Sequence, residues 1–194
     1  MAVANDKWNF IFLAEPHTAS RATRDALLKL EGSYNAGSHH CDIETLLHRK
    51  HLRRRKRSRY TTFCTVRNPA DILTTLWVQL QPTCESEDRT FPEYIRHWGY
   101  KRPETFFFRH VESADQVVRY ENLEEDLNFL LRGLHAPSVR LREVVEPTLN
   151  KAPWFRYYTM ADLWYILSNY PEIARLGYAD AIYQQIDAKY RKLT

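Results

Sequence analysis

Apolar and polar residues follow one another along the chain in blocks that predict strands, each followed by a helix. The run "WNFIFLA" at residues 8–14 has aromatic and β-branched members and stops at Pro16, which is typical of a buried strand. From Ser20 onward, apolar residues recur every three or four positions, as on one face of an amphipathic helix that Gly32 can end. The start of the chain therefore predicts a strand, a short loop and a helix.

Two later segments repeat this order. The β-rich run "YTTFCTV" at residues 60–66 leads through "RNP" to a helical pattern, and Pro69 suits the first turn of that helix. Residues 115–134 predict a third strand and helix, with Asn122 able to cap the helix and acidic residues in its first turn. Alternating strands and helices predict an α/β fold with three α/β/α layers around a mainly parallel sheet, as a single domain over residues 1–194.

The remaining segments carry weaker patterns. Residues 34–42 are loop-like, and residues 43–49 carry a short helical pattern. A short helix is predicted over residues 92–98, within a segment at 82–105 that mixes charges, aromatics and prolines. From residue 141 to the end the chain is predicted to be helical, with aromatic side chains that pack together. The chain has no run of about 18 consecutive apolar residues and no basic start followed by an apolar core, so we expect a cytoplasmic protein with no membrane segment.

Composition adds little to this picture, except in the cysteines. Apolar residues make up 44% of the chain and charged residues 27%, which is typical of a soluble globular protein. Cys41, Cys64 and Cys84 are odd in number and show no paired spacing. We therefore expect free thiols and neither a disulfide framework nor a zinc site.

Charge is concentrated in one segment. Residues 48–59, "HRKHLRRRKRSR", hold eight of the 28 Lys and Arg residues of a chain whose net charge is +4. The segment is either a solvated surface or a patch that binds an anionic or polysaccharide acceptor. Nucleic acid is disfavoured, because base stacking needs interleaved aromatic residues and only Tyr60 flanks the segment.

The carboxyl ends of the predicted strands are where ligands bind in such sheets. The first of these loops, "PHTASRAT", offers the hydroxyl groups of Thr18, Ser20 and Thr23 together with backbone N–H groups at a helix start, where the dipole favours an anion. It lacks the glycines and the Gly-Lys pair of a Walker loop, which disfavours a nucleoside triphosphatase. A phosphate site and a merely well-capped helix both remain open for this loop.

The second loop follows the strand at residues 60–66. It places Arg67 at the strand end and Thr75 eight residues later, two helical turns along. An arginine with a nearby hydroxyl can clamp a second phosphate through charge-assisted hydrogen bonds. A structural capping role for the Arg-Asn-Pro turn is an equal alternative.

Taken together with "RYENL" at residues 119–123, these loops resemble the sulfotransferases that depend on 3′-phosphoadenosine 5′-phosphosulfate (PAPS). The resemblance implies a P-loop-like sulfotransferase fold, in which Tyr120 and Glu121 help to hold the core. It implies that Arg67 and Thr75 bind the 3′-phosphate of PAPS, and that Lys151, beside Asn150, reaches over the cofactor. The positions that match the family's 5′-phosphosulfate loop are Pro16, His17, Thr18, Ala19, Ser20, Arg21 and Ala22.

The same resemblance implies the reaction. A sulfuryl group would pass from PAPS to a hydroxyl or amine of a small-molecule or carbohydrate acceptor, with 3′-phosphoadenosine 5′-phosphate (PAP) as the product and no metal. The family's loop lysine is replaced by His17, which acts as a cation only when it is protonated, and Arg21 would share that work. Two alternatives stay open: a catalytically silent module that binds nucleotides or polyanions, and a kinase relative that uses ATP.

A base must also accept the proton of the acceptor. The segment "GSHHCD" at residues 37–42 is similar to a histidine-containing segment found in the family. His40 and His39 are therefore the candidate bases, with Asp42 as an orienting group, although both histidines could equally be solvent-exposed loop residues. Glu15, beside the first loop, is the reserve carboxylate base.

Overall fold

The computed structural model describes residues 2–37, 41, 43–47, 57–80, 90–101, 108–141, 153–169 and 171–191. The chain divides into two compact units, each built from two separate stretches of sequence. The first unit contains Met1–Arg67 and Phe107–Val144, and the second contains Asn68–Phe106 and Val145–Thr194. The single domain expected over residues 1–194 stays a prediction.

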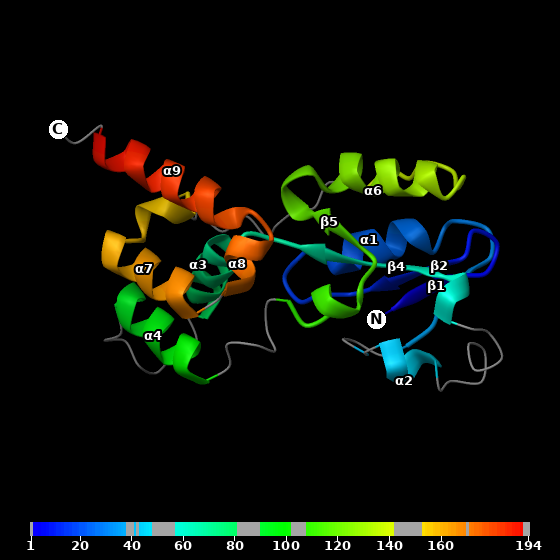
Figure 1. Cartoon of the computed structure of the whole chain (residues 1–194), viewed down its shortest axis with the longest axis horizontal. Helices are drawn as coiled ribbons and strands as arrows, with labels where there is room; N and C mark the ends of the chain where they lie inside the picture. The colour runs from blue at the N-terminus through cyan, green and yellow to red at the C-terminus, as the bar shows by residue number, and fades with distance from the viewer. Residues whose placement is uncertain are drawn as a thin grey trace. The chain divides into compact units, whose positions relative to one another are not determined.

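A five-stranded sheet forms the centre of the first unit, in the order β3-β1-β2-β4-β5 (Figure 1). β2 pairs with β4, and β4 with β5, in parallel, whereas β1 pairs with both β2 and β3 antiparallel. The sheet is therefore mixed, although the strands predicted from the hydrophobic runs are the parallel ones. The bounds are β1 Val3–Asn5, β2 Phe10–Leu13, β3 Ser33–Asn35, β4 Thr61–Val66 and β5 Gln116–Arg119.

The two antiparallel strands were not expected, and the loop predicted from residue 34 is wrong at its start, where β3 lies. Both strands are three residues long, which is too short for an alternating pattern to be recognised. Their pairing is fixed by tertiary contacts. The fully buried side chain of Asn5 donates to Glu31 O and to Ser33 Oγ, at 3.0 and 2.7 Å, and so holds β3 beside β1.

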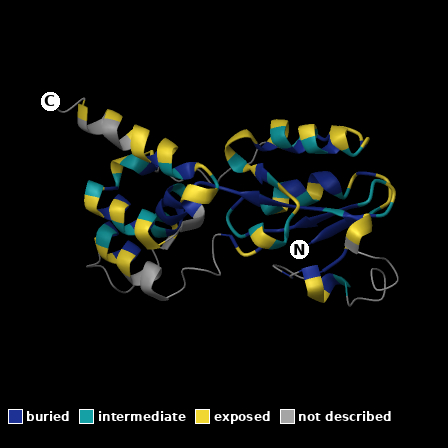
Figure 2. Cartoon of the chain, viewed as in Figure 1, coloured by how far each residue is buried: buried dark blue, intermediate teal, exposed yellow. Residues whose placement is uncertain are grey.

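The predicted helices of the first unit are α1 Ser20–Leu27, α2 Ile43–Leu47 and α6 Leu123–Gly133. Alternate residues of β2 point to opposite faces, so Phe10 and Phe12 share one face with Phe63 of β4. α1 and α6 pack on this face through a common buried core (Figure 2). α2 lies on the other side of the sheet in Figure 1. The α/β character predicted from the sequence is confirmed.

Asn122 occupies the N-cap position of α6, as predicted, but its side chain makes no capping hydrogen bond. The chain enters α6 directly from a short 3₁₀ turn, η3 Tyr120–Asn122. That turn gives Asn122 a backbone φ of −129° and ψ of 36°, outside the extended region from which a side chain usually caps a helix. The other short turns of this unit are η1 Arg57–Arg59 and η2 Val111–Ser113.

The second unit is helical over its described residues. An aromatic cluster joins its two stretches of sequence: Phe91 packs edge-on against Tyr158, with ring centres 4.8 Å apart, and Tyr158 packs against Trp154 at 5.7 Å. The Tyr158 hydroxyl donates to Ala70 O at 2.9 Å. The bounds are α3 Pro69–Leu80, α4 Phe91–Lys101, η4 Trp154–Arg156, α7 Met160–Asn169, α8 Pro171–Arg175 and α9 Tyr178–Arg191. None of the helices within the described residues combines the length and apolar composition needed to cross a bilayer.

Candidate functional site

The loop between β2 and α1 turns tightly without glycine. His17 and Ala19 take left-handed backbone conformations, with φ angles of 58° and 57°. Each such conformation at a residue with a Cβ costs about 1–2 kcal/mol, so the surrounding structure must hold the loop in this form. Left-handed residues in a turn direct successive N–H groups toward one concave side, and such concavities bind anions. The loop thus adopts a conformation for which glycine is the usual residue, and it does so where a helix begins.

Thr18 ties this loop to the sheet. Its side chain is fully buried, and its hydroxyl donates to Glu15 O at 3.0 Å. Because a hydroxyl has one proton to donate, the 2.5 Å hydrogen bond between Thr18 and Thr65 Oγ1 on β4 must be donated by Thr65. The Thr18 hydroxyl therefore positions the loop, and the predicted contact of this hydroxyl with a phosphate stays a prediction.

Substitution of Thr18 by valine is expected to lower the free energy of unfolding by about 1–3 kcal/mol, because the substitution leaves Glu15 O and the Thr65 hydroxyl buried without their partner. Thr18→Ser, which keeps the hydroxyl, is the matched control and should lose less. Urea unfolding of both variants measures the difference. Valine keeps the methyl group of threonine, so a loss in Thr18→Val no larger than that in Thr18→Ser would contradict a dominant role for the hydroxyl.

Arg67 connects the loop to two neighbouring strand ends. It follows β4, and its Nη1 donates to His17 O at 3.3 Å. Its guanidinium lies 4.1 Å from the ring centre of Tyr120, the residue that follows β5. Only 5% of Arg67 is exposed. The structure therefore brings together the ends of β2, β4 and β5, as the rule for parallel strands predicted.

Glu15 lies directly beneath the loop and is fully buried. Its Oε1 accepts a hydrogen bond from the backbone N–H of His110, and its Oε2 has no partner among the described residues. Burial raises the pKa of Glu15 to about 7, although the His110 amide and the charge of Arg109 act in the opposite direction. The pKa of Cys64 on β4 is raised as well, mainly by burial and further by the charge of Glu15.

The other predicted residues of the loop lie nearer the surface. Arg21 is exposed, whereas His17 is half-buried, as are Pro16, Ser20 and Ala22. Thr75 lies in the second unit, where it is buried and its hydroxyl donates to Asp71 O at 2.8 Å, one helical turn back. The predicted residues outside the described part of the chain are His39, His40, Asp42, Asn150, Lys151 and most of the basic segment at 48–59.

Two residues that hold the loop were missed from the sequence. Thr65 is a polar residue inside a buried strand, which is a weak signal that its hydroxyl has a partner. His110 supplies its backbone N–H from a turn 95 residues away from Glu15, and no local pattern marks it. Both contacts are products of the tertiary fold.

The turn after β2 and the start of α1 are the features of the described residues that suit an anion. The described residues contain no group of three or more His, Cys, Asp or Glu side chains placed to bind a metal ion. A ligand at this edge of the sheet would meet the N–H groups of the loop and the start of α1, with Arg21 exposed beside them.

Comparisons of the chain with protein-family models, with curated proteins and with solved structures found no match.

Proposed function

We propose that the chain is a PAPS-dependent sulfotransferase with a P-loop-like sulfotransferase fold, transferring a sulfuryl group to a hydroxyl or amine acceptor. The observation that carries the proposal is the loop after β2, in which His17 and Ala19 take left-handed conformations immediately before α1. Arg67 binds the carbonyl of this loop from the neighbouring parallel strand. This arrangement supports a loop that cradles a negatively charged group.

In the proposed reaction, the attacking oxygen or nitrogen of the acceptor forms a bond to sulfur while the bond from sulfur to the phosphate oxygen of PAPS breaks. PAP leaves, and the proton of the acceptor passes to a base. Charge on the leaving oxygen is neutralised by the loop N–H groups, by protonated His17 and by Arg21. Glu15 is fully buried, and its Oε1 accepts a hydrogen bond from the backbone N–H of His110. We therefore assign Glu15 to supporting the loop and not to contact with an acceptor. His40 or His39 keeps the role of proposed base.

Thermal unfolding with nucleotides tests the proposed binding site. PAP at about 100 times its Kd is expected to stabilise the chain by about 2.7 kcal/mol, which raises Tm by several degrees for a chain of this size. ADP lacks the 3′-phosphate and should raise Tm less at equal concentration. Equal shifts with PAP and ADP would argue against a site that recognises the 3′-phosphate.

A silent binding module is the second candidate, and His17 is the residue that favours it. A histidine with an unperturbed pKa of about 6.5 is mostly neutral above neutral pH, whereas a lysine would remain charged. Release of PAP from PAPS in the presence of a panel of hydroxyl and amine acceptors distinguishes the two. Binding of PAP without any turnover between about pH 6 and about pH 8 would favour the module.

A further inference from the structure

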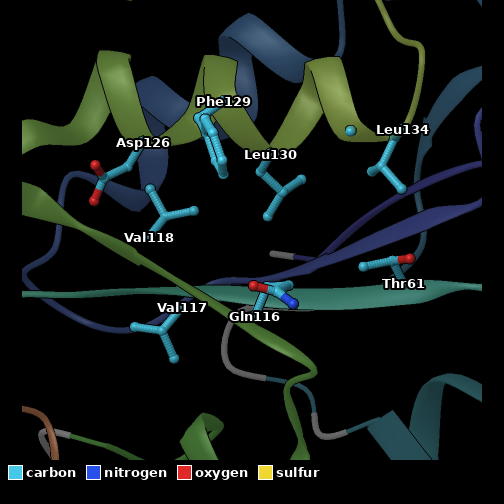
Figure 3. Close-up of a pocket in the computed structure, with 9 residues that line it drawn as sticks. Thr61, Gln116, Val117, Val118, Asp126, Phe129, Leu130 and Leu134 are labelled. Atoms are coloured by element: carbon cyan, nitrogen blue, oxygen red, sulfur yellow. The ribbon is translucent and has the colours of Figure 1, made fainter.

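An open groove runs between α6 and β5 in the first unit, with a volume of about 470 Å³ (Figure 3). Gln116, Val117 and Val118, three consecutive residues of β5, line one side. The other side is the surface of α6 that carries Phe129 and Leu130, both of which point toward the strands. Nothing in the proposed reaction uses this groove.

The groove lies between α6 and the sheet, where Thr61 of β4 also lines it, and it reaches the backbone of the edge strand β5. Side chains of a strand alternate between its two faces, and Val118 points toward α6 while Val117 points to the opposite side (Figure 3). Since the side chain of Val117 points away from α6, Val117 can line the groove only through its backbone. β5 is also the last strand on this side of the sheet as far as the described residues extend.

Hydrogen bonding indicates which backbone groups face the groove. The N–H of Arg119 donates to Asp126 Oδ2 on α6, at 3.1 Å. In an extended strand the N–H groups of every second residue point the same way, so the N–H and C=O of Val117 also point away from β4 and toward the groove. Exposed backbone groups along a strand edge are a template for a further strand.

We propose that this groove binds an extended peptide segment of another protein, which adds a strand to the outer edge of β5. An apolar side chain of the peptide would enter the space between Val118 and Leu130, where apolar groups line the groove. Phe129, whose surface is 74% exposed, would be covered at the same time. Asp126 is the one charged residue among the described residues that line the groove, so the charge of the lining favours a peptide with basic residues.

The test uses the full chain and a fluorescein-labelled synthetic peptide of alternating β-branched residues with lysine at each end, KVTVTVK. Fluorescence anisotropy is expected to show saturable binding. Amide signals of Val117, Val118, Phe129 and Gly133 should shift in ¹⁵N-resolved NMR spectra. The charge-reversed peptide EVTVTVE should bind more weakly, and KVTPTVK, whose central proline cannot continue the strand pairing, should bind least.

Two variants test the site from opposite sides. Val117→Pro removes the outward N–H without removing a donor to β4, and the loss of this hydrogen bond should weaken peptide binding about tenfold. Gly133 lines the groove, and apart from its chain neighbours and the backbone of its own helix no atom of the described residues lies within 4 Å of the position that a Cβ would take there. Gly133→Leu should therefore fold normally and fill the groove, with a similar loss of affinity, whereas Gly133→Ala leaves the groove open and is the matched control.

Circular dichroism and Tm show whether each variant is folded. If Val117→Pro fails to fold, the difference in peptide affinity between Gly133→Leu and Gly133→Ala still tests whether the peptide binds in the groove. The proposal is overturned if none of the peptides binds, or if binding is unchanged in folded Gly133→Leu. It is also overturned if sedimentation shows a dimer that Gly133→Leu abolishes, since a second copy of the chain would then occupy the groove.

Discussion

The free energy of unfolding is expected to fall by about 3 kcal/mol between about pH 4.5 and about pH 7 through the titration of Glu15 alone. Burial raises the pKa of Glu15 from 4.5 to about 7 in the folded chain. Below about pH 4.5 Glu15 is protonated in both the folded and the unfolded chain, and above about pH 7 it is ionised in both. Between the two, the folded chain keeps a proton that the unfolded chain has lost, so stability falls as the pH rises. Above about pH 7 the full cost of a buried, ionised carboxylate remains.

Glu15→Gln separates this effect from every other titrating group. The glutamine keeps the oxygen that accepts from His110 N–H but cannot ionise, so this variant should be less stable than the wild type at acid pH or equal to it, and more stable at about pH 8. Urea unfolding across the pH range measures the difference, and Glu125→Gln, an exposed acid on α6, is the control that should follow the wild type. A difference between Glu15→Gln and the wild type that stays constant with pH would contradict the raised pKa.

Much of the parallel part of the sheet could be predicted from local patterns. The apolar runs that form β2 and β4 are buried, and polar turns flank the run that forms β5. The helices that follow these strands have clear apolar faces. Their carboxyl ends meet because parallel strands end at the same edge of a sheet. The proximity of the loop after β2 to Arg67 and Tyr120 follows from that rule.

The contacts that shape the loop could not be predicted in this way. Thr18 meets Thr65 across 47 residues of sequence, and Glu15 meets His110 across 95. The left-handed conformation of Ala19 goes against the usual preference of alanine, and tertiary contacts of the loop have to compensate for its cost. Sequence patterns report local preference and burial, whereas these features depend on which distant groups the fold places side by side.

Arg67→Met is expected to lower the affinity for PAP by about 100-fold, because about two charge-assisted hydrogen bonds to a phosphate are lost. This prediction rests on the proposed function. Isothermal titration with PAP and with ADP provides the measurement. Arg67→Lys keeps the charge but loses the planar group that lies over Tyr120, so it should recover only part of the affinity. Arg140→Met, at an exposed arginine, is the control and should bind PAP as the wild type does.

The pair of ligands distinguishes the loop-holding role that the geometry gives Arg67 from the phosphate-binding role that the proposed function gives it. The guanidinium binds His17 O and lies over the Tyr120 ring with only 5% of the residue exposed, so it also holds the loop in place. If the main effect of Arg67 is to hold the loop, Arg67→Met should lower the affinities for PAP and ADP by the same factor. Tyr120→Leu should then also lower both affinities equally. If Arg67 binds the 3′-phosphate itself, PAP should lose far more affinity than ADP, because only PAP carries that group. A selective loss for PAP in Arg67→Met, with equal and smaller losses for both ligands in Tyr120→Leu, is the expected result.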